Sequence, residues 1–164
     1  MPEESGISVR LATNEDAGQI RELVFGILAE YNLKPDPEGI DADLYDIESS
    51  YFGNGGVFEV LVDGAGSIIG SVGLFRIDEK TVELRKMYLD KAFRGAGLGK
   101  ITLKRMIATA TGLGYKKMVL ETASPLVEAI GLYKSFGFRP AEAAHAPRCD
   151  RAFFYDLTLD AIQQ

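Results

Sequence analysis

The order of apolar and polar residues in the first third of the chain predicts one strand followed by two helices. Residues 6–12 alternate between apolar and polar positions, which is the period of a half-buried strand. Thr13 then predicts a helix N-cap, with Asp16 three residues on as its capping-box partner. The apolar residues that follow at helical spacing are Ala17, Ile20, Val24, Ile27 and Tyr31. Residues 32–56 are rich in Pro, Gly and Asp, but their apolar spacing predicts a second, short helix. Its apolar positions are Leu44, Ile47 and Tyr51.

Three strands joined by tight turns are predicted in the middle of the chain. Residues 57–62, 67–77 and 81–89 are rich in β-branched and other apolar residues. The Asp-Gly-Ala-Gly sequence at 63–66 is a strong hairpin signal, and Asp-Glu-Lys at 78–80 is a second turn. Strands linked by such short turns pair antiparallel.

Helices and strands alternate in the second half of the chain. A glycine-rich segment at 94–100 precedes a helix, and residues 115–122 form the next predicted strand. Ser124 predicts the N-cap of a further helix, with Pro125 at its first position. The alternating residues 152–159 predict a last strand. The complete order predicts an α+β fold with a mixed sheet, in which residues 81–122 form a right-handed parallel crossover.

Composition is that of an ordinary globular protein. Of the 164 residues, 46% are hydrophobic and 26% are charged, and no linker or repeat divides the chain, so residues 1–164 are expected to form a single domain. No apolar run is long enough to span a membrane, and the acidic N-terminus argues against a signal or transit peptide. The one cysteine, Cys149, cannot form an internal disulfide. We therefore expect a cytoplasmic protein.

Charge is distributed unevenly along the sequence. The net charge of −6 combines −12 in residues 1–84 with +6 in residues 85–164. This asymmetry fits ordinary solvated faces, and it equally fits an anionic cofactor on the second half with a cationic partner near the first. A nucleic-acid partner is not expected, because the basic stretch is short and the chain is acidic overall.

The segment 94–100 is the most informative stretch for function. Its residues are Arg94, Gly95, Ala96, Gly97, Leu98, Gly99 and Lys100. Glycine allows the backbone to approach a ligand closely, and the free N–H groups at a helix start attract anions. A glycine-rich turn before a solvated helix would also explain the pattern, but three glycines in seven residues are destabilising unless the backbone needs them. The segment therefore predicts a site for a phosphate-bearing cofactor.

Two common phosphate motifs do not match this segment. A Walker A motif would require glycine at Arg94 and Ser or Thr after Lys100, where the chain has Ile101. A dinucleotide-binding fingerprint would require Gly-x-Gly-x-x-Gly directly after its strand, whereas this segment is Gly-x-Gly-x-Gly and begins four residues later.

A third motif does match. Arg94, Gly97 and Gly99 satisfy Arg-x-x-Gly-x-Gly, which resembles the coenzyme A pyrophosphate motif of the GNAT superfamily of acyl-CoA-dependent N-acetyltransferases. Residues 83–89 (Glu-Leu-Arg-Lys-Met-Tyr-Leu) resemble the central strand of that family. Residues 129–138 resemble its second cofactor helix and the turn that follows. The order of elements also agrees over nearly the whole chain.

The resemblance implies a GNAT-type α+β fold, with a mixed, mostly antiparallel central sheet of about six to seven strands flanked by about four helices. It implies acetyl-CoA (coenzyme A) as donor of an acetyl or similar short acyl group, a primary amine as acceptor, direct attack without a covalent enzyme intermediate, and no metal. A small molecule, an amino acid, an antibiotic and a protein lysine remain open as acceptors. No membrane partner is expected, and a homodimer is left open. The alternative is a non-catalytic acyl-CoA-binding sensor or regulatory domain.

The resemblance also implies which residues hold the cofactor. The backbone N–H groups of residues 94–100 and the Arg94 side chain would bind the pyrophosphate. The backbone of Met87, Tyr88 and Leu89 would pair with the pantetheine arm like an added strand, and an N–H near Leu89 would polarise the thioester carbonyl. Many family members carry a cofactor-contacting Asn where this chain has Leu126, so that contact is not expected here.

Two catalytic residues follow from the same comparison. Tyr133 would by itself be an ordinary core tyrosine, but the resemblance assigns it the hydroxyl that protonates the departing CoA thiolate. Glu83 is the candidate base, acting through water, and it equally fits a strand residue paired with Arg85. A base matters more for a lysine-like amine of pKa ~10.4 than for an α-amino group of pKa ~7.7–8. Glu121 is the reserve candidate.

Two further features carry weaker hypotheses. Cys149 could carry an acyl group with the help of His145, which is near it in sequence, but the chain offers no third orienting residue and the resemblance favours direct attack. Residues 31–52 are rich in acidic and aromatic residues, and by resemblance they form one wall of the acceptor site. Their acidity favours a cationic acceptor.

Overall fold

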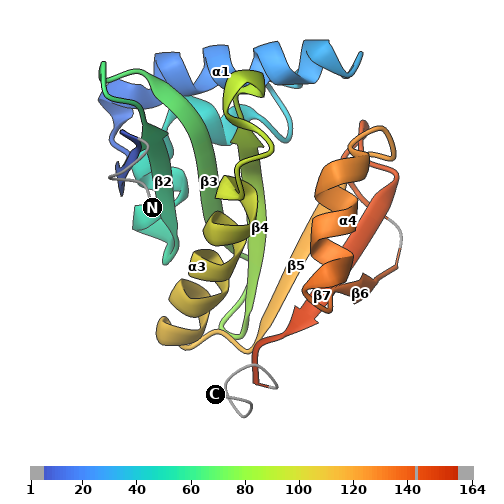
Figure 1. The fold of residues 1–164 in the computed structure, drawn as a ribbon. Coiled ribbons are helices and arrows are strands. Elements are labelled where there is room, and N and C mark those ends of the chain that lie inside the picture. Colours follow the sequence, from blue (N-terminus) through green and yellow to red (C-terminus); the bar gives the residue numbers. More distant parts are fainter. Residues whose placement is uncertain (1–5, 143, 159–164) are drawn as a thin grey trace.

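A single seven-stranded sheet with helices on both faces forms the fold in this computed structural model, which describes residues 6–142 and 144–158 (Figure 1). The strands are β1 (Ser8–Leu11), β2 (Val57–Val62), β3 (Ile68–Arg76), β4 (Thr81–Leu89), β5 (Lys117–Thr122), β6 (Arg139–Pro140) and β7 (Arg151–Asp156). The α-helices are α1 (Ala17–Glu30), α2 (Ile47–Ser50), α3 (Leu98–Gly112) and α4 (Val127–Ser135). Short 3-10 turns lie at Asn14–Asp16, Ala42–Tyr45, Phe52–Asn54 and Lys91–Phe93.

The strand order is β1-β2-β3-β4-β5-β7-β6, and neighbours are antiparallel except for the parallel pair β4 and β5. This confirms the predicted α+β fold with a mixed, mostly antiparallel sheet. Within the described residues, no helix is long and apolar enough to cross a membrane.

The helices divide the core between the two faces of the sheet. Helices α1 and α2 pack on one face in a cluster that includes Ile20, Val24, Ile47 and Phe58. Helices α3 and α4 pack on the other face, where Leu84, Met106, Ile130 and Tyr133 belong to a second cluster. Alternating side chains of the central strands supply both clusters, as the period of a strand requires.

Local signals set most element boundaries, with one exception. The predicted capping box is confirmed: Thr13 Oγ1 accepts a hydrogen bond from Glu15 N–H, and Asp16 Oδ2 accepts one from Thr13 N–H at 2.9 Å. The predicted N-cap at Ser124 is wrong, because Leu126 occupies that position before α4. Ser124 Oγ instead donates to Asp150 Oδ2 at 2.6 Å, which connects the segment between β5 and α4 to the segment before β7.

The strand β6, at the edge of the sheet, was not predicted, since two residues carry no periodic pattern. The last predicted strand corresponds to β7, and Leu159, at the end of that prediction, lies outside the described residues.

The sheet opens between its two central strands. Strands β4 and β5 pair only from Thr81 to Glu83 and from Lys117 to Val119, and beyond this point they diverge (Figure 1). The ends of the two strands therefore form the walls of a gap in the middle of the sheet, and the helices α3 and α4 begin beside it.

Candidate active site

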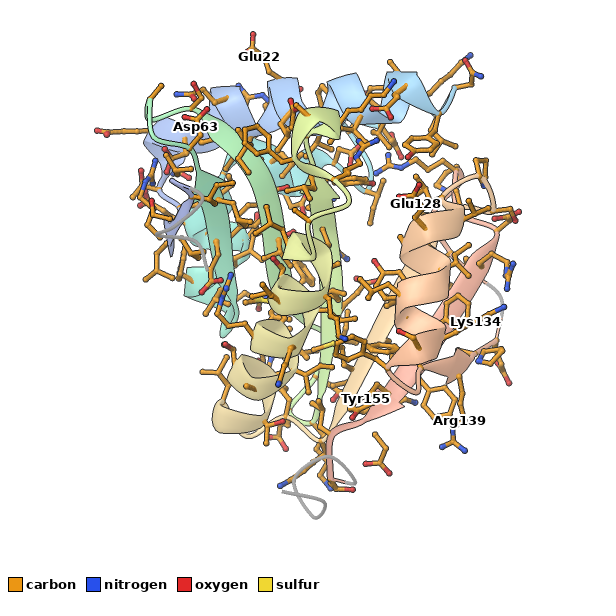
Figure 2. The ribbon with its side chains drawn as sticks, in the orientation of Figure 1. Glu22, Asp63, Glu128, Lys134, Arg139 and Tyr155 are labelled. Carbon is orange, nitrogen blue, oxygen red and sulfur yellow. The ribbon has the colours of Figure 1, made fainter. Side chains whose placement is uncertain are left out.

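A cavity of about 380 Å³ occupies the region where β4 and β5 separate. Its lining comes from the second half of β4, the end of β5, the segment 94–100 before and into α3, the start of α4, and the segment after α1. Glu128 marks the first turn of α4 beside this opening (Figure 2). The predicted catalytic and cofactor-binding residues, except Ala96, all line this one cavity.

The glycine segment forms one end of the cavity. Gly95 and Gly97 have φ values of 87° and 84°, in the left-handed region that L side chains avoid. Gly97 is the N-cap of α3, so the first N–H groups of the helix have no partner within it and face outward at its positive end. This geometry suits an anion, and it explains why the chain uses glycine here.

Arg94 is held beside this segment by other parts of the protein. Its Nε donates to the carbonyl of Leu89 at 2.8 Å, and its Nη1 donates to Glu30 Oε2 at 2.5 Å. The hydrogen bond to Glu30 raises the pKa of Arg94, and Arg94 lines the cavity. Its side chain is thus engaged with α1, and a contact with pyrophosphate would require it to exchange or share Glu30.

Tyr133 lies on α4 at the boundary between the core and the cavity. It is 6% exposed and packs beside Phe138 and Phe153, and it also lines the cavity. Burial, and then the nearby Tyr88, raise the pKa of Tyr133 above its ordinary value, and burial raises the pKa of Tyr88 to about 12. Both hydroxyls therefore carry their protons at neutral pH and give them up less readily than an exposed tyrosine would.

A β-bulge in β4 changes the direction of the side chains along the cavity. Arg85 pairs with Gly73 of β3 but Tyr88 pairs with Ser71, so β4 contains one extra residue. Lys86 lies in the bulge with φ of 57°, and Ser71 Oγ donates to its carbonyl at 2.7 Å. As a result Arg85 and the next residue, Lys86, both reach the α1–α2 face.

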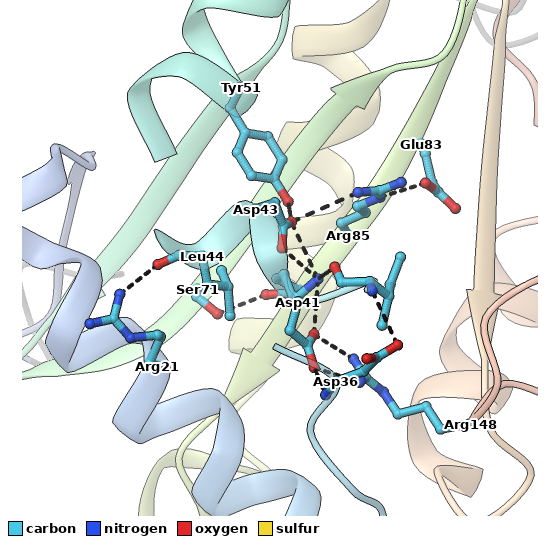
Figure 3. Close-up of polar contacts among 12 residues, drawn as sticks. Arg21, Asp36, Asp41, Asp43, Leu44, Tyr51, Ser71, Glu83, Arg85 and Arg148 are labelled. Atoms are coloured by element: carbon cyan, nitrogen blue, oxygen red, sulfur yellow. Dashed lines mark hydrogen bonds and ion pairs between the residues drawn. The ribbon is translucent and has the colours of Figure 1, made fainter. Parts of the chain in front are cut away.

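Lys86 is the centre of a buried charge cluster, whose acidic members Asp41 and Asp43 are labelled in Figure 3. Its ammonium Nζ lies 3.3 Å from Asp41 Oδ1 and 3.2 Å from Asp43 Oδ1, and it donates to the carbonyl of Ile40 at 3.0 Å. The hydroxyl of Tyr51 donates to Asp43 Oδ2. The bulge thus brings a cation to the segment that follows α1.

Arg148 joins this cluster from the far end of the chain. Its Nη1 and Nη2 bind the two oxygens of Asp41 at 2.6 and 2.8 Å, and Asp41 is fully buried (Figure 3). Burial alone would raise the pKa of Asp41, but the hydrogen bonds from Arg148 and from Asp36 N–H, with the charge of Lys86, lower it. Residues 34–46 and the loop before β7 are thereby clamped together over the α1–α2 face of the cavity.

These ion pairs bear on the expectation that the acidic residues 31–52 attract a cationic acceptor. The two buried acids of residues 31–52, Asp41 and Asp43, are compensated by Lys86 and Arg148. Their charge is therefore not available to attract a cationic acceptor.

Glu83 lies at the point where β4 and β5 separate. It is buried, and its Oε1 accepts a hydrogen bond from Arg85 Nε at 2.5 Å. The structure pairs it with Arg85, as one interpretation of the sequence expects, and places it in the lining of the cavity, where the role of base stays a prediction.

Glu121 and Cys149 have surroundings less suited to catalysis. Glu121 accepts hydrogen bonds from the N–H groups of His145 and Ala146, which lower its pKa against the opposing effect of burial. His145 Nδ1 lies 3.0 Å from Glu121 Oε2, so this imidazole is paired with Glu121 and not with Cys149. Burial raises the pKa of Cys149 to about 11, which keeps the thiol protonated and weakly nucleophilic.

The sequence did not reveal Lys86 or Arg148 as site residues. Lys86 is separated from Asp43 by 43 positions, and Arg148 from Asp41 by 107. Lys86 follows Arg85 in a strand that also contains Glu83, so its charge alone did not single it out. Only the fold shows that its partners lie on the opposite segment.

Comparison with known proteins is consistent with this arrangement. The sequence profile of the family described as Acetyltransferase (GNAT) family matches residues 21–138. The chain is 32% identical over 141 residues to YjgM of Escherichia coli K12, described as an uncharacterized N-acetyltransferase, and the match covers 83% of this chain and 84% of that protein.

Solved structures share the fold. An acetyltransferase of the GNAT family from Staphylococcus aureus Mu50 is 26% identical, with a TM-score of 0.86 over 92% of this chain and 99% of that one. A GNAT superfamily phosphinothricin acetyltransferase from Sinorhizobium meliloti, solved in complex with AcCoA, is 23% identical, with a TM-score of 0.71 over 92% of this chain and 88% of that one.

Proposed function

Because the chain belongs to the acetyltransferase (GNAT) family, and is thus an acyl-CoA-dependent acetyltransferase acting on an amine, we propose that Tyr133 and Glu83 carry out this transfer in the cavity between β4 and β5. The observation that carries the proposal is the continuity of that cavity, whose lining includes both the glycine segment and Tyr133. We further propose that the described residues act as a single domain, since they share one sheet.

The residues at one end of the cavity fit the donor. The left-handed glycines Gly95 and Gly97 let the backbone face a pyrophosphate closely, and the N–H groups through Lys100 supply donors at the positive end of α3. The edge of β4 from Met87 to Leu89 is not paired with β5, which leaves backbone groups free for an extended pantetheine arm.

The chemistry requires one proton donor and one proton acceptor near the reacting atoms. Acetyl-CoA, when bound, supplies a thioester carbonyl for the amine to attack and a thiolate as leaving group. Tyr133 is assigned as the general acid toward the sulfur, because a phenol carries its proton at neutral pH. Burial raises its pKa, which makes it a weaker acid, so the transfer depends on the negative charge that develops on the departing sulfur. Glu83, through water, takes the proton that the amine loses. Its pairing with Arg85 fixes the direction of the carboxylate.

Release of free thiol from acetyl-CoA, measured with a panel of primary amines, tests the proposal. We expect turnover with at least one class of amine, no turnover with secondary alcohols of the same shape, and mass spectrometry showing the acylated amine. Binding of acetyl-CoA without turnover on any amine would instead support the sensor function. If Glu83→Gln leaves the pH–rate profile unchanged, Glu83 is not the base.

A further inference from the structure

Arg85 presents an incompletely used guanidinium group to the cavity. Its side chain is 17% exposed, its carbon Cζ lies 3.8 Å from the centre of the Phe75 ring, and the residue lines the cavity wall (Figure 3). The Nε–H donates to Glu83 Oε1. This contact uses one of the five N–H donors of the group.

The other donors of Arg85 make no hydrogen bond to any described residue. Nη1 is 3.9 Å from Asp43 Oδ2, which is too far for a hydrogen bond. That oxygen already receives the hydroxyl of Tyr51 and lies 3.3 Å from Lys86 Nζ. The unpaired Nη groups are not among the fully buried unpartnered atoms of the described residues, and the side chain is 17% exposed, so a ligand in the cavity can reach them.

The neighbouring cations do not have this freedom. Arg148 is occupied by the two oxygens of Asp41, and Lys86 by Asp41, Asp43 and the carbonyl of Ile40. On the α1–α2 side of the cavity, Arg85 is thus the cation with donors to spare among the described residues. A planar group with two acceptor oxygens matches a guanidinium fork best, and a carboxylate is such a group.

Glu83 and Arg85 together form an acid next to a base. A molecule whose amine and carboxylate are close together complements such a pair, because its carboxylate can accept from the unpaired Nη groups of Arg85 while its amine lies beside the Glu83 oxygen to which Arg85 Nε does not donate. The buried acids Asp41 and Asp43 are already compensated, so this wall gives no comparable site for a polyamine.

We propose that the acceptor is a primary amine that also carries a carboxylate, in the simplest case a free amino acid, and that Arg85 binds this carboxylate while the amine lies beside Glu83. The proposal rests on the proposed function and names the acceptor class for the same cavity. It makes Arg85 a residue that determines acceptor specificity.

Matched pairs of acceptors test this assignment. Thiol release from acetyl-CoA is measured with free amino acids of acidic, neutral and basic side chains, each beside its carboxamide, which keeps the amine and removes the carboxylate charge. We expect kcat/KM for the best amino acid to exceed that of its amide by about 10-fold or more. Arg85→Gln should raise KM for the amino acid by about 10- to 100-fold, with a smaller change in kcat, and should abolish the preference over the amide.

Two variants separate binding from folding. Arg85→Lys keeps the charge but loses the fork, so it should recover part of the lost affinity. Arg139→Gln removes an exposed arginine at the outer edge of the sheet, away from the opening, and should leave both kinetic constants unchanged (Figure 2). The dissociation constant of CoA, measured for every variant, should stay within about 3-fold of the parent if the fold and donor site are intact.

The outcomes distinguish this proposal from the one on which it rests. Two outcomes would overturn the role of Arg85 and leave the acetyltransferase function standing. One is an equal kcat/KM for the amino acid and its carboxamide, and the other is an equal loss of kcat/KM for both in Arg85→Gln. If no amine were turned over, the proposed function would fail. Calorimetric titration of the CoA-loaded protein with the amino acid and its amide would then decide the Arg85 site, because equal or absent binding of the two would overturn it.

Discussion

At the scale of single residues, the position of Tyr133 separates its structural role from its chemical role. The ring packs in the core beside Phe138 and Phe153, and the residue also lines the cavity. Removal of the hydroxyl alone leaves the ring packing almost unchanged, so a phenylalanine at this position isolates the proton donor.

We therefore expect Tyr133→Phe to lower kcat by about 100-fold or more, because general acid catalysis contributes about 10²–10⁴-fold in typical cases. KM for acetyl-CoA should change by less than about 3-fold, since the ring still fills its place. Steady-state thiol release measures both constants. Tyr45→Phe removes a half-exposed hydroxyl outside the cavity and is the control. An unchanged kcat in Tyr133→Phe would remove this residue from the mechanism.

The sequence and the structure contribute differently at this scale. Tyr133, Glu83 and the residues of the glycine segment follow from local motifs, so a resemblance is enough to name them. Lys86 and Arg148 acquire their roles from a β-bulge and from partners distant in sequence, which no local pattern contains. Arg85, by contrast, pairs with Glu83 two residues away, as the sequence suggests. A single sequence shows which residues can carry charge, but it does not show which charges compensate each other.

At the scale of elements, the start of α3 depends on two left-handed glycines. The space around Gly97 is open, because no atom beyond its chain neighbours lies within 4 Å of the position that a Cβ would take. The obstacle to a side chain there is the backbone conformation alone. A left-handed residue other than glycine costs about 1–2 kcal/mol.

Gly97→Ala should therefore destabilise the loop, or shift it, and weaken CoA binding by about 5- to 30-fold, as calorimetric titration would measure. Gly131→Ala is a matched control, because Gly131 lies within α4 with open space around it. This control should be neutral or stabilising by up to about 1 kcal/mol, since alanine is the better helix former. Equal loss of CoA affinity in both variants would contradict the role of the Gly97 backbone.

The clamp between Asp41 and Arg148 is the second feature at this scale. The folded protein lowers the pKa of Asp41, so the charged carboxylate contributes stability above its unfolded value of about 3.9. This contribution is lost as the pH falls through the lower pKa of the folded state.

Asp41→Asn leaves Arg148 and Lys86 without a full counter-charge, and at pH 7 it should reduce the free energy of unfolding by roughly 3–5 kcal/mol. Urea unfolding at a series of pH values measures this. The difference between parent and variant should shrink below about pH 4. Glu22→Gln, on the outer surface of α1, should change stability by less than about 0.5 kcal/mol (Figure 2). A pH-independent difference would show that the loss comes from packing alone.

Elements were predicted best where a periodic pattern coincided with a clear turn. β2 and β4 have the predicted bounds, and the predicted capping box at Thr13 is present, although it caps the 3-10 turn Asn14–Asp16 and α1 begins after that turn, at Ala17. Ser124 failed as a cap because a distant aspartate, Asp150, competes for the same hydroxyl. Local preference decides an element boundary only when no tertiary partner offers a better hydrogen bond.

At the scale of the whole molecule, the two parts of the sheet are joined by little direct pairing. Strands β1–β4 form one part and β5, β7 and β6 the other, and the strand pairing between them is limited to Thr81–Glu83 with Lys117–Val119. A ligand that fills the opening would bridge the two parts. A ligand that binds the folded state and not the unfolded state stabilises the protein, by about 2.7 kcal/mol at a ligand concentration about 100 times the dissociation constant.

This bridging predicts where CoA should protect the backbone. Hydrogen exchange should slow most in residues 87–89 at the open edge of β4 and in residues 95–100 at the start of α3, and least in β2, which is paired on both sides. A nucleotide fragment that lacks the pantetheine arm should protect residues 95–100 but not 87–89, because it reaches only the glycine segment. Equal protection of both segments by the fragment and by CoA would contradict this placement. Uniform protection, with no excess at the opening, would mean that the ligand acts on global stability without lying between β4 and β5.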